Sequence, residues 1–169
     1  MNLKAAFMVL MMSVLTTEVV AFETDLFVGT WRMNLEKSDF VSGPVPRPIG
    51  PNFTRIESVE NGLKFIAQGV NSRNQKMYQE YTITFDGKDH WRDRPLADGK
   101  PDTEQNPGWI SGKQIDNHTL VLTFKTENGR VVMTSKVVVS SEGKTGAVTS
   151  TGFNLDGTTT TGTLYWDRD

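Results

Sequence analysis

Short segments in which apolar and polar residues alternate recur along most of this chain. In residues 119–125 (TLVLTFK), Leu120, Leu122 and Phe124 occupy every second position, and residues 131–139 are rich in valine. A period of two places alternate side chains on opposite faces of a β-strand. Most of these segments are separated by Asn-Gly, Asp-Gly or Glu-Gly pairs, at residues 61–62, 86–87, 98–99, 128–129, 142–143 and 156–157. Asn-Gly and Asp-Gly pairs favour the positive φ angles of tight hairpins, so the pattern predicts consecutive antiparallel strands.

The strand pattern predicts an all-β fold with one domain. Ten segments are candidates, and we expect at least one or two of them to merge, shorten or fail, which leaves eight or nine strands. They are residues 28–35, 52–59, 63–69, 76–85, 88–93, 109–115, 118–126, 131–140, 145–154 and 158–167. Strands joined in order by hairpins favour a single antiparallel up-and-down β-barrel. A β-sandwich is the alternative, because short alternating strands suit both closures.

Residues 1–21 have the features of a secretory signal peptide. Lys4 supplies a positive charge, and residues 5–15 (AAFMVLMMSVL) are apolar and uncharged. Signal peptides contain an apolar segment of about 7–15 residues, whereas a membrane span needs about 20. Val19, Val20 and Ala21 suit cleavage after Ala21. We therefore expect residues 22–169 to form an exported domain, periplasmic or secreted, with no membrane span after cleavage.

Charge and cysteine content narrow the choice of partners. The formal net charge is −2, and the lysines and arginines are scattered, so we expect no nucleic-acid partner. The chain has no cysteine, which excludes disulfides, thiol catalysis and cysteine-bound metals. A domain of this size is able to fold on its core alone, and we expect a monomer.

The beginning and the end of the domain carry a family resemblance. Gly29-Thr30-Trp31 stands on the first predicted strand, directly after the signal peptide, and the last strand ends at Arg168. A Gly-x-Trp motif in this place resembles the lipocalins and the wider calycins. The fuller string from Gly29 to Phe40 is similar to that of small exported bacterial lipocalin-like proteins. The disulfides and the further sequence blocks of animal lipocalins are absent. The resemblance implies a barrel whose closed end is plugged by Trp31, with Arg168 packed on the indole ring.

The polar residues form no recognised catalytic or metal-binding motif. His90 and His118 lie on different predicted strands, whereas catalytic zinc requires three protein ligands. No Gly-x-Ser-x-Gly sequence and no glycine-rich phosphate loop occur. We therefore assign no catalytic residue, no metal site and no cofactor, and an enzyme is the less favoured class. If the barrel is an enzyme of the isomerase or cyclase type, His90 or Glu80 is the candidate acid or base.

The candidate binding site is the lumen of the predicted barrel. A barrel of about eight strands holds either packed side chains or one small ligand, and apolar walls with a few polar groups suit a ligand. Arg92 or Arg94 would meet an acidic head group. The candidate ligand contacts are Tyr81, Phe85, Trp91, Arg92 and Phe124. The alternative is that these aromatic residues simply fill the core.

Three functions are compatible with these features. The favoured hypothesis is a binding protein for a small apolar or amphipathic molecule, with the proline-rich loop of residues 42–51 (SGPVPRPIGP) covering the barrel mouth. A second long loop, residues 94–107, is the weaker lid candidate. The alternatives are a protein-binding or envelope assembly module and a small barrel enzyme.

Overall fold

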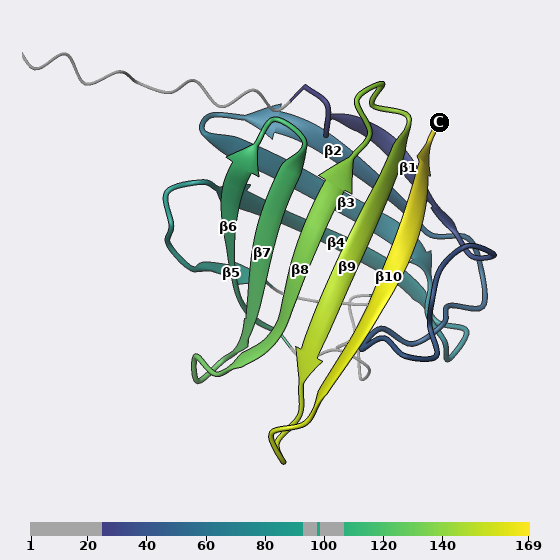
Figure 1. Ribbon diagram of the computed structural model, residues 1–169, viewed down its shortest axis with the longest axis vertical. Coiled ribbons are helices and arrows are strands. Elements are labelled where there is room, and N and C mark those ends of the chain that lie inside the picture. Colours follow the sequence, from purple (N-terminus) through teal and green to yellow (C-terminus); the bar gives the residue numbers. More distant parts are fainter. Residues whose placement is uncertain (1–24, 93–97, 99–106) are drawn as a thin grey trace, which may run out of the picture.

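The protein forms one antiparallel sheet of ten strands that curves into a barrel (Figure 1). The computed structural model describes residues 25–92, 98 and 107–169. The signal-peptide prediction for residues 1–21 lies outside these residues, as does most of the second loop. The strands are β1 (Gly29–Asn34), β2 (Phe53–Val59), β3 (Gly62–Val70), β4 (Lys76–Thr84), β5 (His90–Arg92), β6 (Gly108–Asp116), β7 (Thr119–Thr126), β8 (Val131–Val139), β9 (Thr145–Phe153) and β10 (Thr159–Arg168).

The sheet has an up-and-down topology. Each strand pairs antiparallel with its sequence neighbours, and β1 pairs with β10, which gives the order β4-β3-β2-β1-β10-β9-β8-β7-β6-β5. The two ends of the sheet, β4 and β5, meet at a seam, where the side chain of Ile83 on β4 fills the space over Gly112 on β6. The barrel is therefore nearly closed. The predicted all-β barrel is confirmed, and the sandwich alternative is wrong.

All ten candidate segments form strands, so the expected number of eight or nine was wrong, although the segment 88–93 is shortened to three residues. β5 is only three residues long, but it stays separate from β4 because the turn at Asp86 and Gly87 lies between them. The described residues contain no helix, and hence none that is long and apolar enough to cross a bilayer.

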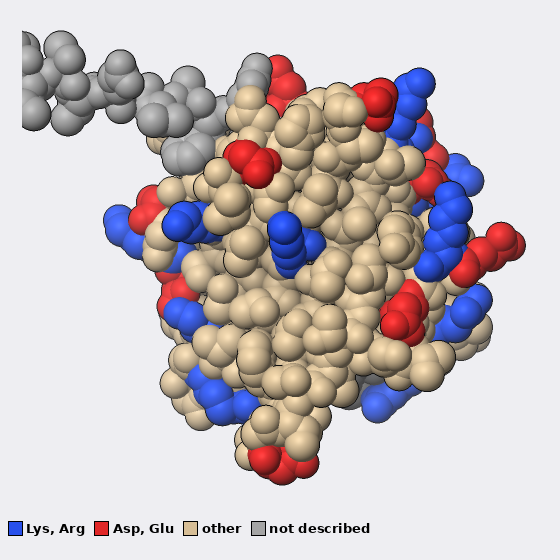
Figure 2. Space-filling view, viewed as in Figure 1, with Lys and Arg blue, Asp and Glu red and all other residues tan. Residues whose placement is uncertain are grey.

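The threonine-rich strands β9 and β10 place most of their threonines on the outside of the barrel. Thr149 and Thr163 share a hydrogen bond of 2.9 Å between their hydroxyl oxygens, and Thr151 and Thr161 share one of 3.0 Å. Alternate positions such as Ser150 are buried inside. Figure 2 shows that the face formed by β6–β10 has few charges, and most of these lie near its border. Successive side chains along these strands thus point alternately into the lumen and toward the outer surface.

One end of the barrel is closed around Trp31. Its indole Nε1 donates a hydrogen bond of 2.8 Å to the carbonyl of Phe27, which is fully buried. The Arg168 guanidinium lies 5.5 Å from the Trp31 ring and donates hydrogen bonds to the carbonyls of Gly143 and Val28. Gly29 has a φ of 141°, and a Cβ atom there would lie 2.6 Å from Arg168 Nε. A glycine is therefore required where the chain passes this arginine.

Candidate functional site: the barrel lumen

The lumen contains a cavity of about 270 Å³ above the Trp31 end. Apolar side chains from nearly every strand line it, among them Ile56, Phe65, Leu122, Val137 and Leu164. The polar lining gathers toward the mouth of the barrel, where Gln79 and the Ser135–Ser150 pair are buried. An apolar cavity with a few polar groups is the usual form of a small-molecule site.

Arg92 brings a charged group into this cavity. The residue is 8% exposed, and its guanidinium carbon lies 4.7 Å from the centre of the Phe124 ring and 5.6 Å from that of Tyr81. Among the described residues, Arg92 Nε has no hydrogen-bond partner and no carboxylate pairs with the guanidinium. Burial lowers the pKa of Arg92, and the Tyr81 hydroxyl partly offsets this shift. Arginine keeps its charge at neutral pH, so the lumen holds a cation stabilised mainly by aromatic rings.

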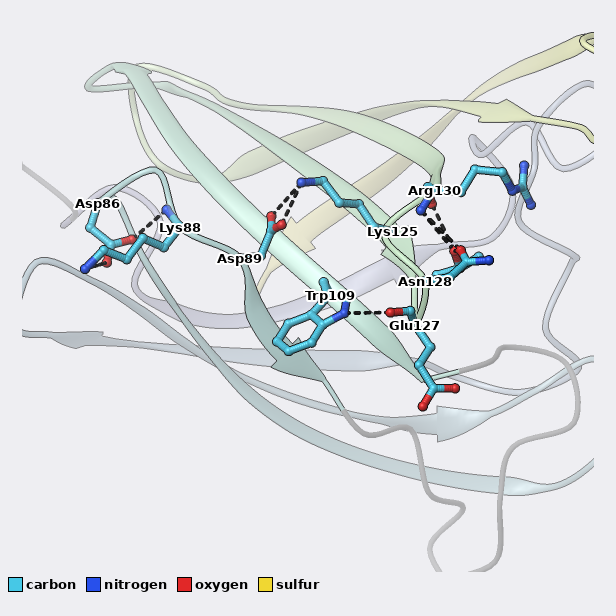
Figure 3. A network of polar contacts seen from close by, with 9 residues as sticks. Asp86, Lys88, Asp89, Trp109, Lys125, Glu127, Asn128 and Arg130 are labelled. Carbon is cyan, nitrogen blue, oxygen red and sulfur yellow. Dashed lines mark hydrogen bonds and ion pairs between the residues drawn. The ribbon is translucent and has the colours of Figure 1, made fainter.

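The short strand β5 is fixed from the outside, which positions Arg92. Lys125 Nζ on β7 donates hydrogen bonds of 2.8 and 2.7 Å to the two carboxylate oxygens of Asp89, the residue before β5 (Figure 3). Trp91 packs edge-on against Trp109 of β6, with ring centres 5.0 Å apart. These outer contacts and the β5–β6 ladder hold the strand so that Arg92 points inward.

A proline-rich loop covers the mouth of the cavity. We call residues 42–51 the cap loop; it follows β1 and precedes β2. Its residues Val45, Pro46 and Pro48 line the cavity, and Pro48 is buried. Asp39, just before the loop, donates its backbone N–H to the carbonyl of Thr163 on β10, at 2.9 Å. The loop therefore lies over the barrel mouth, as expected from the sequence.

The residues proposed as ligand contacts divide into two groups. Tyr81, Arg92 and Phe124 lie together on the cavity wall. Trp91 is 41% exposed on the outer face, because it alternates with Arg92 along β5. Phe85 packs at the edge of the core, just beyond the end of β4, and does not line the cavity. Arg94 lies outside the described residues.

Sequence reasoning missed the Ser135–Ser150 pair. Their hydroxyl oxygens lie 2.8 Å apart, between β8 and β9, and both residues are buried on the lumen side. The available signal was the alternation itself, because a serine at an inward position of a valine-rich strand marks a polar point in the lumen.

The two candidate acid–base residues do not line the cavity. Glu80 lies on the outer face, where Lys64 Nζ approaches it to 2.6 Å and the Tyr78 hydroxyl donates to it at 2.9 Å. Both hydrogen bonds lower the pKa of Glu80, and the bond from Lys64 has the larger effect. His90 Nε2 lies 2.8 Å from Thr84 Oγ1, near the seam. In the described part of the chain, no three histidine, aspartate or glutamate residues are grouped so as to hold a metal ion.

Comparison with known proteins identifies a solved structure with a similar fold. No protein-family model matches this sequence, and no curated protein is significantly similar to it. Among solved structures, the chain is similar to zebrafish ileal bile acid-binding protein, which was crystallised in complex with cholic acid. The TM-score is 0.52 at 13% sequence identity, and the similarity covers 85% of this chain and 99% of that chain. The protein thus has a nearly closed antiparallel barrel of the calycin type.

Proposed function

We propose that this protein is an exported binding protein for a small amphipathic acid. The carboxylate of the ligand would pair with Arg92, and its apolar part would lie along Phe124, Leu122 and the remaining lumen wall. The observation that carries this proposal is the buried guanidinium without a carboxylate partner among the described residues.

The proposal follows from the free-energy cost of burying the charged Arg92 guanidinium where no carboxylate of the described residues pairs with it. Burying a charged group without a partner is unfavourable, and each unsatisfied buried polar atom costs about 1–3 kcal/mol. The rings of Tyr81 and Phe124 offset part of this cost, at about 0.5–2 kcal/mol for each contact. They supply no anion. A carboxylate entering the cavity would supply it, with charge-assisted hydrogen bonds of about 1.5–3 kcal/mol each.

Two further observations support the proposal. Zebrafish ileal bile acid-binding protein, a barrel of similar fold, is named for binding amphipathic acids. Export is supported by the apolar segment and cleavage pattern of residues 1–21. Expression with the native leader should yield a mature protein that begins at Phe22, as N-terminal sequencing would show.

The decisive experiment compares an acid with its neutral counterpart. Isothermal titration calorimetry would measure octanoate and octanamide binding to the mature wild type and to Arg92→Met. We expect the wild type to prefer octanoate by about tenfold or more and Arg92→Met to lose this preference. Arg55→Met is the matched control, because Arg55 is exposed on the outer face of β2 and pairs with Glu57. Equal binding of acid and amide, or binding of neither, would contradict the proposal.

A further inference from the structure

The cap loop is packed onto the barrel by close contacts between backbones. Gly162 on β10 faces the lumen, and a Cβ atom there would lie 2.5 Å from Gly43 Cα and 2.9 Å from the carbonyl oxygen of Asp39. On the neighbouring strand, a Cβ atom at Gly152 would lie 2.6 Å from Pro44 Cβ. Contacts below 3.0 Å to backbone require the loop to move. Two inward glycines at the mouth therefore make the space in which the cap loop lies.

The cap loop also has internal features that favour one docked position. The Asp39 carboxylate accepts hydrogen bonds from the backbone N–H groups of Val41 and Ser42, at 3.0 and 3.1 Å. Four prolines within residues 42–51 restrict φ, so that less conformational freedom is lost when the loop docks. The loop thus acts as a fixed wall of the cavity.

With the loop docked, the cavity is small. Its volume of about 270 Å³ equals the liquid volume of about nine water molecules. Ligand pockets usually range over about 300–1,000 Å³, so this one lies at the lower end of that range. Trp31 bounds the cavity at the closed end, and Pro46 and Pro48 bound it at the mouth. The strands beside the loop are held by their ladders, so a larger lumen at this end requires the loop to move.

We propose that the docked cap loop sets the size of the ligand, so that the lumen takes a compact acid, with one ring or a medium-length chain, and rejects long-chain or steroid-sized acids. This inference rests on the proposed function, because it takes the acid at Arg92 as given. The contacts that set the limit are those of Gly152 and Gly162 with the loop.

The test is a size series of acids. Calorimetry would measure octanoate, palmitate and cholate binding to the wild type and to Gly162→Ala, whose added methyl group displaces the loop. We expect the wild type to bind octanoate at least about tenfold more tightly than palmitate or cholate, a difference of about 1.4 kcal/mol. In Gly162→Ala this gap should close, and the Val41 and Ser42 amides should exchange hydrogen faster.

Controls separate this effect from a general disturbance of the sheet. Gly146→Ala adds an inward methyl group at the closed end, where the nearest atom would be 3.6 Å away, and should keep the size limit. Gly152→Ala displaces the loop from β9 and replaces Gly162→Ala if that variant does not fold. A wild type that binds palmitate or cholate as tightly as octanoate overturns the size limit alone. An unchanged preference in a folded variant with a displaced loop does the same. A wild type that binds no acid at all overturns the proposed function as well.

Discussion

Replacing Arg92 by methionine should change the stability of the ligand-free barrel only slightly. Arg92 is 8% exposed, and its Nε is unsatisfied among the described residues, a state that costs about 1–3 kcal/mol. The substitution also removes two cation–π contacts, each worth about 0.5–2 kcal/mol. Methionine restores part of that loss through contacts of its sulfur with the same rings, about 0.3–1.5 kcal/mol. At their central values these terms nearly cancel, so the free energy of unfolding should change by less than about 1 kcal/mol.

Urea unfolding, followed by tryptophan fluorescence, measures this difference. The protein must first be unfolded and refolded to remove bound molecules. At an m value of about 2 kcal/mol/M, a gain of 1 kcal/mol raises the urea midpoint by about 0.5 M. With excess octanoate the wild type should be clearly more stable than the variant, because a ligand that binds only the folded state stabilises it, and the wild type binds more tightly.

A large loss of stability in the ligand-free variant would refute this reasoning. If Arg92→Met lost more than about 2 kcal/mol, the guanidinium would be an anchor of the fold, and its burial would no longer point to an absent anion. Arg55→Met tests whether the loss of a positive charge by itself changes the stability. The exposed Arg55–Glu57 pair contributes only about 0–1 kcal/mol to the free energy of unfolding.

Two further predictions concern the polar groups of the lumen and the cap loop. Ser135→Ala should lower the free energy of unfolding by about 1–2 kcal/mol, because it leaves the Ser150 hydroxyl unpaired. The double variant with Ser150→Ala should lose less than the sum of the single variants, with a coupling energy of about 1 kcal/mol in urea unfolding. Strictly additive losses would show that the hydrogen bond contributes nothing. The backbone N–H groups of Ser42 and Val41 lower the pKa of Asp39 below 3.8, so its contribution to stability is fully present above pH 3.8 and is lost as the pH falls through the lower folded-state pKa. Thermal unfolding of the wild type and Asp39→Asn should therefore differ by a constant amount above that pH and converge below it, and a difference independent of pH would exclude this role of the charge.

The strands were predictable because local signals agreed along the whole chain. Five of the turns that the sequence marks with an Asn-Gly, Asp-Gly or Glu-Gly pair contain a residue with positive φ. These residues are Asn61, Gly87, Gly129, Gly143 and Gly157. Every strand boundary lies within two residues of its predicted position. The number of strands was underestimated, because the pattern does not show that a segment as short as β5 stays a separate strand.

The cavity was less predictable, since it depends on which residues meet after closure. Naming both Trp91 and Arg92 as wall residues contradicts strand alternation, and the structure has only Arg92 inside. That no carboxylate of the described residues pairs with Arg92 depends on how the barrel packs, and no sequence pattern reveals it. Gly152 and Gly162 did leave a signal, because a glycine inside a strand often marks the close approach of another backbone.

The position of Arg92 connects binding with closure of the barrel. Its strand, β5, is one end of the sheet, and no ladder joins it to β4 within the described residues. The guanidinium contacts Tyr81 of β4 and Phe124 of β7, so side-chain contacts join these strands where backbone hydrogen bonds do not. A carboxylate bound there would complete the environment of the cation and strengthen these contacts. The group best suited to recognise an acid is thus also one of the groups that join the strands at the seam, beside the Thr84–His90 pair and the contact of Ile83 with Gly112. For this reason occupancy of the lumen and rigidity of the seam are expected to rise together.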